Sequence, residues 1–425
     1  MAEESVQEHV RRVAEEARAA SGALAQTSAA QRNGALAAMA AALRTHARAI
    51  VEANGRDMEA ARAAGTKESL LDRLMLDDAR VEAMAAALED LVALPDPLGA
   101  VQQERTLENG IELTRVSVPL GVVAVVYEAR PNVTADAAGI CLKSGNAAVL
   151  RGGSLAAASN EVIARVLHDA AVAAGMPRGC IGAITSTDRA AADELMQLHG
   201  VVDVLIPRGG AGLIRHCVET SKVPVIETGT GNCHVYVHES ADFERARAII
   251  VNAKCRRLGV CNAAETLLVD EAAAEGFLPA ALADLAERGV TLHADERASA
   301  VAAAHGIAVV PADETDWATE YLAPDLAVHV VSGVDEAIEH VNRFGTKHSE
   351  AIVAEDERAV EAFLARVDAA AVYANASTAF TDGAQFGLGA EIGISTQKLH
   401  ARGPFALDAL TSYKYVLRGS GQVRP

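Results

Sequence analysis

The chain has 425 residues, which predicts two or three domains because a domain holds roughly 150 residues. Half of the residues are hydrophobic and 22% are charged, which excludes a disordered chain because there is enough apolar material for packed cores. The net charge of −19 comes from 38 basic and 57 acidic residues, so non-specific attraction to nucleic acid or to an anionic membrane surface is disfavoured. A local basic pocket can still bind an anionic substrate.

The composition also predicts the cellular compartment. The first 20 residues begin with acidic side chains and have an amphipathic pattern, without the basic and apolar regions of a secretory signal. No run of about 18 apolar residues is present to span a membrane. The six cysteines form no CxxC pair and no dense framework. We therefore expect a cytoplasmic protein in a reducing compartment.

The first elements in chain order are helices and a hairpin. Residues 3–94 are rich in Ala, Leu, Glu and Arg at helical spacing, and a group of helix breakers follows at 95–99. Residues 105–116 then alternate around Asn109-Gly110, a dipeptide that accepts positive φ at both central positions of a tight turn. We expect a two-stranded ribbon, which is marginal in isolation and therefore packs on another surface such as a neighbouring subunit.

The next stretch has short apolar runs separated by segments of helix length. The expected strands are 122–127, 147–151, 181–184, 201–206 and 223–226. Continuous apolar runs joined by crossovers indicate a parallel sheet covered on both faces, with right-handed connections. Ligands bind outside the carboxyl ends of such strands, where Gly, Arg and Asn are concentrated in this sequence.

A second alternating series predicts a second α/β domain. Its expected strands lie near 235, 265–269, 307–310, 326–331, 351–353 and 371–373. Residues 376–404 are Gly-rich and irregular, which is typical of a functional or disordered loop. The run at 412–417 is a candidate partner for the hairpin.

Two loops are candidate phosphate cradles, although no strand is followed by the GxGxxG fingerprint. The first loop supplies Arg208, Gly209, Gly210 and Gly212 between an expected strand and an expected helix, where backbone N–H groups and the helix dipole favour an anion. The alternative is a tight turn that needs glycine. The second loop supplies Arg151 and Ser154, and with no acidic residue beside them it suits a 2′-phosphate.

Cys261 is a candidate nucleophile. It follows a Gly-containing segment, and three cations, Lys254, Arg256 and Arg257, precede it within seven positions; nearby positive charge lowers the pKa of a thiol. The alternative is a small buried hydrophobe. Cys233, His234, His238, Cys255 and Cys261 match no common zinc spacing, so we expect no metal site, and no GxSxG elbow indicates a serine hydrolase.

Several segments in the same order resemble one family. They are 118–123, 127–132, 227–234, 259–266, 389–396 and 400–404. Together they are similar to the γ-glutamyl phosphate reductase family of the aldehyde dehydrogenase superfamily, and the resemblance extends over nearly the whole chain.

The resemblance implies an α/β, aldehyde dehydrogenase-like fold. A Rossmann-type parallel-sheet cofactor domain would comprise residues 1–103 and 119–230, including the helical N-terminal segment. A second α/β, catalytic domain would comprise 231–395. A small β-ribbon for oligomerisation would comprise 104–118 and 405–425.

The implied activity is reduction of L-glutamyl 5-phosphate to L-glutamate 5-semialdehyde by NADPH, with release of phosphate, in proline biosynthesis. Cys261 would form the thioester intermediate, and Asn132 is the best candidate for a side-chain donor to the oxyanion. Glu227 precedes Cys261 by 34 residues, which matches the superfamily spacing between a Glu and the nucleophilic Cys, and would have a modest role in positioning or proton handling, with a structural role as the alternative. Glu320 would hold the nicotinamide ribose, with an exposed surface carboxylate as the alternative.

The resemblance also suggests how anionic groups and partners are bound. Guanidinium groups match phosphate and carboxylate best, and the candidates are Arg130, Arg256, Arg257 and Arg402. A homo-oligomer, either a dimer or a tetramer, and functional coupling to glutamate 5-kinase are expected, with no nucleic-acid or membrane partner. Two other functions stay open: an NAD-dependent oxidative aldehyde dehydrogenase, and a non-catalytic binding or metal-sequestering protein.

Overall fold

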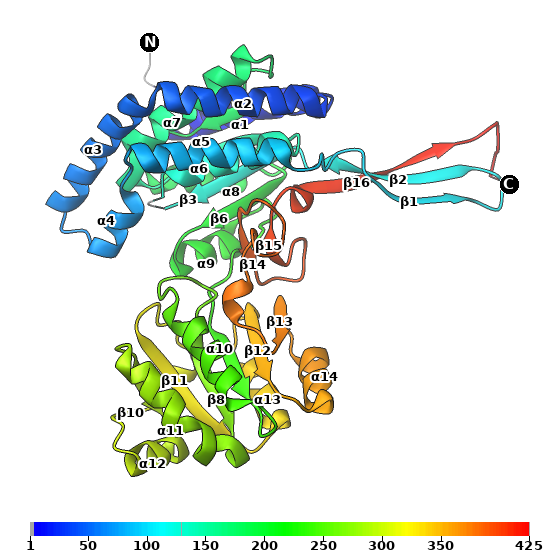
Figure 1. The fold of residues 1–425 in the computed structure, drawn as a ribbon. Helices are drawn as coiled ribbons and strands as arrows, with labels where there is room; N and C mark the ends of the chain where they lie inside the picture. Colours follow the sequence, from blue (N-terminus) through cyan, green and yellow to red (C-terminus); the bar gives the residue numbers. More distant parts are fainter. Residues whose placement is uncertain (1–3, 129, 425) are drawn as a thin grey trace. The chain divides into compact units, whose positions relative to one another are not determined.

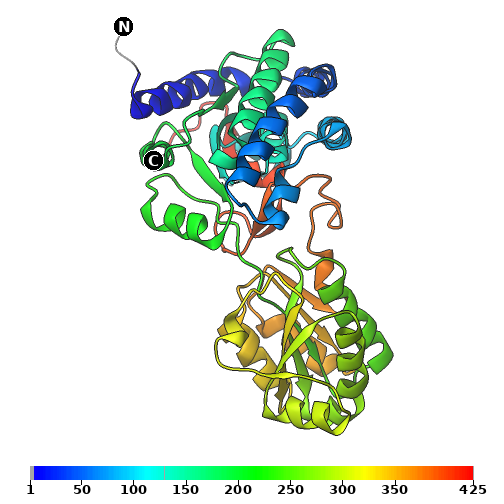
Figure 2. The ribbon, with the colours of Figure 1, turned by 90° about the vertical axis from the view of Figure 1, so that its left-hand side faces the viewer.

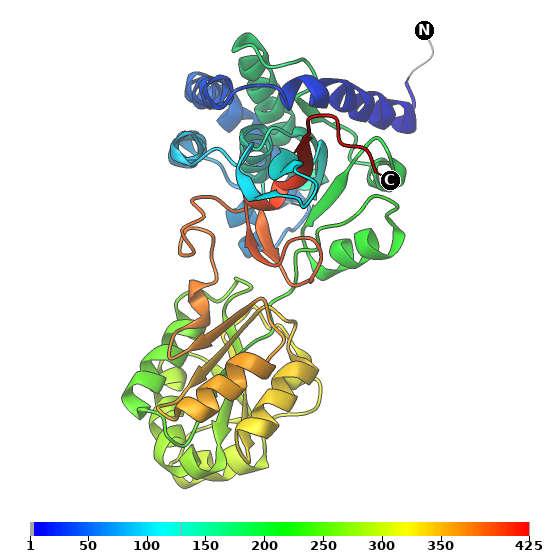
Figure 3. The same cartoon turned by 90° about the vertical axis from the view of Figure 1, so that its right-hand side faces the viewer.

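The computed structural model describes residues 4–128 and 130–424, and the chain forms two compact units. Unit 1 contains the chain up to Glu227, together with Leu388–Gly393 and the segment from Phe405 onward. Unit 2 contains Thr228–Gly387 and Ile394–Pro404. Each unit has its own β-sheet with helices packed on it (Figures 1, 2 and 3). The predicted domain limits and their functional assignments stay a prediction.

Unit 1 begins with the expected helices. They are α1 (Val6–Leu24), α2 (Ala29–Thr45), α3 (Ala47–Ala63), α4 (Glu68–Leu74) and α5 (Asp78–Ala93). Capping boxes fix two of the starts, because Ser5 and Glu8, like Ser28 and Gln31, satisfy each other's free backbone N–H groups. The helical prediction for residues 3–94 is confirmed for the described residues.

The main sheet of unit 1 is parallel, with strand order β5-β4-β3-β6. Its strands are β3 (Val122–Tyr127), β4 (Ala147–Gly152), β5 (Ile181–Ala183) and β6 (Val204–Arg208), and the helices between and after them are α6 (Asn132–Lys143), α7 (Ala157–Ala173), α8 (Arg189–Gln197) and α9 (Ala211–Thr220). Every residue of β3 is buried, which explains its uninterrupted apolar sequence. The predicted strand at 223–226 is wrong: this segment makes a single bridge, Leu205 to Val225, and Pro224 has no N–H to extend the pairing.

A three-stranded antiparallel ribbon extends from the rest of unit 1 (Figure 1). It contains β1 (Val101–Thr106), β2 (Glu112–Pro119) and β16 (Thr411–Arg418), with β2 in the centre. The predicted strand pair and its C-terminal partner are confirmed. The predicted two-residue turn is wrong, because the loop has five residues, 107–111, in which Gly110 alone among the described residues has positive φ.

The sheet of unit 2 is parallel, with strand order β10-β9-β11-β8-β7-β12-β13. Its strands are β7 (Cys233–Val237), β8 (Ala264–Asp270), β9 (Thr291–Ala294), β10 (Val310–Pro311), β11 (Asp325–Val331), β12 (Ser349–Val353) and β13 (Ala371–Ala374). Alternate side chains pack on opposite faces: Leu267 joins the core under α10 (Phe243–Cys255), α11 (Glu271–Glu287) and α12 (Glu296–Ala304). Leu268 joins the core under α13 (Val334–Phe344) and α14 (Glu357–Arg366).

The expected strands of unit 2 differ from the observed ones in two places. Strand β9 was not predicted, and the predicted strand at 307–310 is reduced to the two residues of β10. Residues 376–404 are largely irregular, as expected, with the short elements η3 (Thr378–Phe380), β14 (Gly393–Ser395) and β15 (Gly403–Phe405). Among the described residues, no helix is both long and apolar enough to cross a membrane.

Candidate active site

Cys261 lies in the loop that connects α10 to β8, just before β8 begins. Its side chain is half-buried. Cys233, at the start of the neighbouring strand β7, donates a hydrogen bond from Sγ to the carbonyl oxygen of Cys261 at 3.1 Å. In unit 2 the candidate nucleophile therefore lies where the strands begin, and not at the carboxyl ends where ligands of parallel sheets usually bind.

The backbone of Gly231 packs directly against the backbone of Cys261. A Cβ atom at position 231 would overlap the carbonyl group and Cα of Cys261, so this approach requires glycine. The N–H of Gly231 donates to Glu320 Oε1 at 2.6 Å. Burial raises the pKa of Glu320, and this hydrogen bond opposes the rise. Glu320 is the residue expected to bind the nicotinamide ribose, and one of its two carboxylate oxygens is thus already bonded to Gly231, beside Cys261.

The three cations that precede Cys261 differ in their surroundings. Lys254 is fully buried, and its Nζ lies 2.5 Å from Glu265 Oε2, so its charge is compensated. Arg256 and Arg257 are exposed just after α10. The expectation that these cations favour the thiolate form of Cys261 stays a prediction, and for Lys254 it is weakened by the pairing with Glu265.

Cys233 and His348 were not identified as site residues from the sequence. The Cys233 side chain is buried, and its Sγ lies 3.7 Å from His348 Nδ1. Burial raises the pKa of Cys233 well above its usual value, with nearby Glu350 acting in the same direction. Burial lowers the pKa of His348 to about 4. Cys233 therefore stays a protonated thiol that donates to the loop, and no histidine spacing in the sequence indicates this contact.

Arg402 belongs to a cluster of charges around Asp368. Its Nη2 donates to Asp368 Oδ1 at 2.7 Å, and Lys398 Nζ lies 3.0 Å from Asp368 Oδ2. Hydrogen bonds from Arg402 and Lys398 lower the pKa of Asp368 to about 2. Arg402 is expected to bind the substrate, and its guanidinium already donates one hydrogen bond to Asp368 within unit 2.

In unit 1, the predicted cofactor residues lie at the carboxyl ends of β4 and β6. Arg151 is 9% exposed, and its Nη2 donates to the carbonyl oxygens of Thr187 at 2.8 Å and Asp188 at 3.0 Å. Burial lowers the pKa of Arg151. The guanidinium thus holds the loop that follows β5, while Ser154 is exposed at the start of the short helix η1 (Ser154–Ala156).

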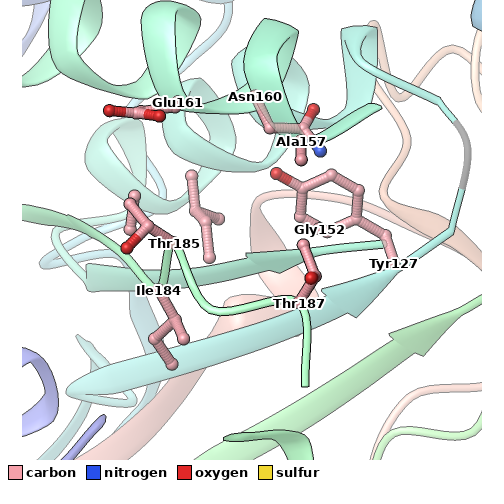
Figure 4. Close-up of a pocket in the computed structure, with 10 residues that line it drawn as sticks. Tyr127, Gly152, Ala157, Asn160, Glu161, Ile184, Thr185 and Thr187 are labelled. Carbon is pink, nitrogen blue, oxygen red and sulfur yellow. The ribbon is translucent and has the colours of Figure 1, made fainter. Parts of the chain in front are cut away.

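A small pocket lies at the same end of this sheet, between the strand ends and the first turns of α7 (Figure 4). Its wall includes Tyr127, Gly152, Asn160, Ile184 and Thr187. Asn160 is 8% exposed, its Oδ1 accepts from Thr134 Oγ1 at 3.0 Å, and its Nδ2 has no hydrogen-bond partner among the described residues. An unsatisfied buried donor beside apolar side chains fits the polar edge of a bound nucleotide.

The predicted cradle at 207–212 carries a carboxylate at its helix N-terminus. Glu128 Oε2 accepts from the N–H of Gly210, the residue before α9, at 2.8 Å. A Cβ atom at Gly209 would lie 2.7 Å from the Glu128 carboxylate. This helix end therefore attracts an anion, as its dipole predicts, and a nucleotide phosphate would compete with Glu128. Arg208 is half-buried, and Gly212 lies in the first turn of α9.

Asn132 is the first residue of α6, and its side chain is exposed. Its Nδ2 donates to Asp136 Oδ2 at 3.0 Å, one helical turn later. Burial raises the pKa of Asp136 to about 6, and the hydrogen bond from Asn132 opposes this rise. Asp136 therefore orients the amide of Asn132; the i, i+4 spacing is the sequence signal that could have identified it.

The predicted residues divide between the two units. Unit 1 holds Arg130, Asn132, Arg151, Ser154, Arg208, Gly209, Gly210, Gly212 and Glu227. Unit 2 holds Arg256, Arg257, Cys261, Glu320 and Arg402. Within unit 2, the structure joins Glu320 to Cys261 through Gly231, whereas Arg402 is paired with Asp368. Arg130 is exposed and Glu227 is half-buried.

Comparison with known proteins gives concordant matches over almost the full length. A sequence model of the aldehyde dehydrogenase family matches residues 2–305 and 288–416. γ-Glutamyl phosphate reductase of Moorella thermoacetica is 54% identical over 408 residues, which are 96% of this chain and 97% of that protein. The Thermobifida fusca protein of the same name is 52% identical over 419 residues, 99% of each chain. The crystal structure of γ-glutamyl phosphate reductase from Thermotoga maritima is 45% identical, with a TM-score of 0.96, over 98% of this chain and 100% of that one.

Proposed function

This chain belongs to the aldehyde dehydrogenase family and, within it, to the γ-glutamyl phosphate reductases, and from that premise we propose that it reduces L-glutamyl 5-phosphate to L-glutamate 5-semialdehyde with NADPH, in proline biosynthesis. The family uses a pyridine nucleotide, and its substrates are small molecules. The observation that carries the proposal is the half-buried Cys261, fixed between the start of β8 and the turn at Gly231.

The chemistry begins with the thiolate of Cys261. A carboxylate accepts hydride poorly, whereas an acyl phosphate has a good leaving group. The thiolate attacks the acyl carbon, the oxyanion is stabilised by the backbone N–H of Cys261 and by the amide of Asn132, and phosphate leaves to give a thioester. NADPH, when bound, supplies the hydride for reduction to the aldehyde, whose release restores the thiol. Asp136 holds the Asn132 amide in this role.

The residues for NADPH are those at the carboxyl ends of the unit 1 strands, with Glu320 in unit 2. Arg151 and Ser154 suit the 2′-phosphate, although the bonds from Arg151 to Thr187 and Asp188 limit its free donors. The loop containing Arg208, Gly209, Gly210 and Gly212 suits the pyrophosphate. The pocket beside Asn160 supplies a further donor for the nucleotide, and Glu320 retains one oxygen for the ribose.

The remaining roles follow from charge and position. Arg130, Arg256 and Arg257 are exposed cations suited to the substrate phosphate and carboxylate, and Arg402 joins them if it exchanges Asp368 for substrate. Glu227 acts in positioning or proton handling and not in the activation of water, because hydrolysis of the thioester would waste the activated substrate.

The wider setting is also part of the proposal. The three-stranded ribbon exposes Val101, Tyr413, Tyr415 and Leu417, and apolar side chains on an open sheet suit contact with a second copy of the chain, as a dimer or tetramer. Coupling to glutamate 5-kinase would deliver the labile acyl phosphate directly, and the location would be the reducing cytoplasm.

An assay in the oxidative direction tests the proposal. With L-glutamate 5-semialdehyde and NADP⁺, we expect reduction of the nucleotide that depends on added phosphate. An oxidative aldehyde dehydrogenase would not need phosphate. Cys261→Ser should abolish turnover because the hydroxyl is a far weaker nucleophile, whereas Cys180→Ser, a change at a buried cysteine of unit 1, should leave it. Turnover by Cys261→Ser, or turnover without phosphate, would refute the proposal.

A further inference from the structure

A buried ion pair closes the base of the loop that carries Cys261. Lys254 is the last residue but one of α10, and Glu265 is the second residue of β8. Nζ of Lys254 lies 2.5 Å from Oε2 of Glu265, and both side chains are 0% exposed. The pair therefore joins the two ends of the segment 256–263, in which Cys261 lies.

Stability alone is a weak explanation for this pair. Transfer of two charges from water into a protein interior is unfavourable, and replacement of such a pair by apolar side chains is often neutral or stabilising. Burial raises the pKa of Glu265 to about 7, against the opposing attraction of Lys254. The protein interior thus disfavours the ionised carboxylate of Glu265. A contribution to folding stability therefore does not explain why a charged pair lies at this position.

The second carboxylate oxygen of Glu265 contacts the segment 320–322, which in turn is bonded to Gly231 next to Cys261. Oε1 accepts from the N–H of Leu322 at 3.2 Å, and Leu322 has a left-handed backbone with φ of +52°. Two residues earlier, Glu320 accepts from the N–H of Gly231 at 2.6 Å. Gly231 in turn lies against the backbone of Cys261.

These contacts form a closed path through unit 2. It runs from the base of the Cys261 loop, through Lys254 and Glu265, to the segment 320–322, and then through Gly231 back to Cys261. The path holds the loop both at its ends and at Cys261 itself. A nucleophile displaced by about 1 Å can lose on the order of 100-fold in rate, so these contacts bear on turnover directly.

We propose that Lys254 and Glu265 are positioning residues that hold the Cys261 sulfur in place for attack on the acyl group. The proposal rests on the proposed reductase activity for its kinetic consequence, but the mobility of the loop can be measured without substrate. Neither residue needs to touch the substrate or the nucleotide.

The test uses the full-length protein with two variants. Lys254→Met removes the cation at similar length and leaves Glu265 to accept from Leu322, while Lys254→Met/Glu265→Leu removes both polar contacts. The matched control is Arg247→Met/Asp284→Leu, which removes a half-buried pair between α10 and α11, with Arg247 Nε 2.8 Å from Asp284 Oδ2. Each is assayed for kcat, for KM of the semialdehyde and NADP⁺, and for the rate of Cys261 alkylation by iodoacetamide.

We expect the double variant to fold and to lose kcat by roughly 10- to 100-fold, with each KM nearly unchanged. Lys254→Met should lose less, because without the cation the buried Glu265 becomes a neutral carboxylic acid, which burial already favours, and still accepts from Leu322. Alkylation should become faster in both variants, since a loosened loop exposes the half-buried sulfur more often, and the control should match the wild type in all readouts. A general loss of structure would instead lower kcat, raise KM and reduce melting temperature together.

The outcomes separate the two proposals. If the double variant keeps wild-type kcat and alkylation rate, the positioning role is wrong. If the double variant does not fold, Lys254→Met decides by the same readouts, and wild-type values there also refute the role. If the wild type shows no phosphate-dependent activity, the proposed function fails, while faster alkylation in the variants still supports control of the loop.

Discussion

Gly231 determines how closely two segments of unit 2 approach at Cys261. The absence of a side chain lets its backbone lie against the Cys261 carbonyl, and its N–H donates to Glu320. A Cβ atom at this position would collide with backbone atoms, which cannot rotate away as a flexible side chain can. The distance between the turn and the loop therefore depends on this one residue.

Gly231→Ala should reduce turnover by at least about 100-fold, because the Cys261 loop must move by an ångström or more to admit the new methyl group. The comparison is Gly55→Ala in α3, where a Cβ atom meets nothing within 4 Å and where Ala favours the helix by about 0.5–1 kcal/mol. Steady-state assays and thermal melts of both variants measure the effect. Full activity in Gly231→Ala would show that the loop tolerates displacement.

At this scale the sequence identifies single reactive groups better than their contacts. Cys261 was a candidate because of its local sequence, whereas the partners that hold it, Lys254, Glu265 and Gly231, come from separate parts of the chain. In the sequence Lys254 is only one of three cations near Cys261. Its burial and its pairing with Glu265 depend on the packing of α10 on β8, which no local pattern records.

Helix α13 carries the buried His340 into a group of aromatic rings. The His340 ring centroid lies 4.8 Å from that of Phe344, 5.0 Å from that of His329 and 5.7 Å from that of Trp317. Burial lowers the pKa of His340 to about 2, and the neighbouring His234 and His329 act in the same direction. The packing of α13 on the sheet therefore requires a neutral imidazole.

This packing predicts a dependence of stability on pH. Because the pKa of His340 is lower in the folded protein than in the unfolded chain, the unfolded chain binds the extra proton, and stability falls as pH falls below about 6.5. At pH 5 the loss from this residue is about 2 kcal/mol. His340→Phe should remove this contribution of His340 to the acid-induced loss. The free energy of unfolding of the variant should therefore fall less between pH 7 and pH 5 than that of the wild type.

Denaturant unfolding at the two pH values provides the measurement. His305→Phe, a change at an exposed residue just after α12, should retain the wild-type difference between pH 7 and pH 5. An equal acid-induced loss in His340→Phe and in the wild type would mean that the protonation of His340 does not oppose folding.

Elements were predictable where burial alone determines them. The run that became β3 is buried at every residue and its sequence is continuously apolar. Strands β8 and β12 are also buried throughout, and the apolar runs 267–269 and 351–353 within them predicted both strands, although each strand also contains a buried Glu. Strand β9 was missed because its residues Thr291–Ala294 alternate between exposed and buried and include only one large apolar side chain. The run at 223–226 was overpredicted because its apolar residues pack in the core without forming a ladder.

The ribbon of unit 1 brings together strands that lie far apart in the sequence. Strand β2 pairs with β1 on one edge and with β16, about three hundred residues later, on the other, from Glu112–Arg418 to Pro119–Thr411. Arg115 lies over the Tyr413 ring at 3.9 Å. The pairing was anticipated as a possibility from strand-like residues at 412–417, but sequence spacing carries no information about a contact across so long an interval.

Removal of residues 411–425 should therefore leave one edge of β2 without a partner. An open strand edge promotes pairing with other chains, so we expect a changed oligomeric state or aggregation and a lower melting temperature. Removal of 423–425 serves as the control, because these residues lie beyond β16 and Val423 is 88% exposed. Light scattering after size-exclusion chromatography measures the oligomeric state of both deletion variants. An unchanged assembly in the longer deletion would exclude the ribbon as the contact between copies.

The same connectivity has a consequence for synthesis of the chain. All strands of the unit 2 sheet, from Cys233 to Ala374, are synthesised before the codons for β16 are translated. The sheet of unit 2 can form while translation is still in progress, but strand β2 can pair on both edges only after residues 411–418 have been made. A nascent chain stalled after Ala374 would thus carry every strand of the unit 2 sheet, while β2 would still lack one of its two partner strands.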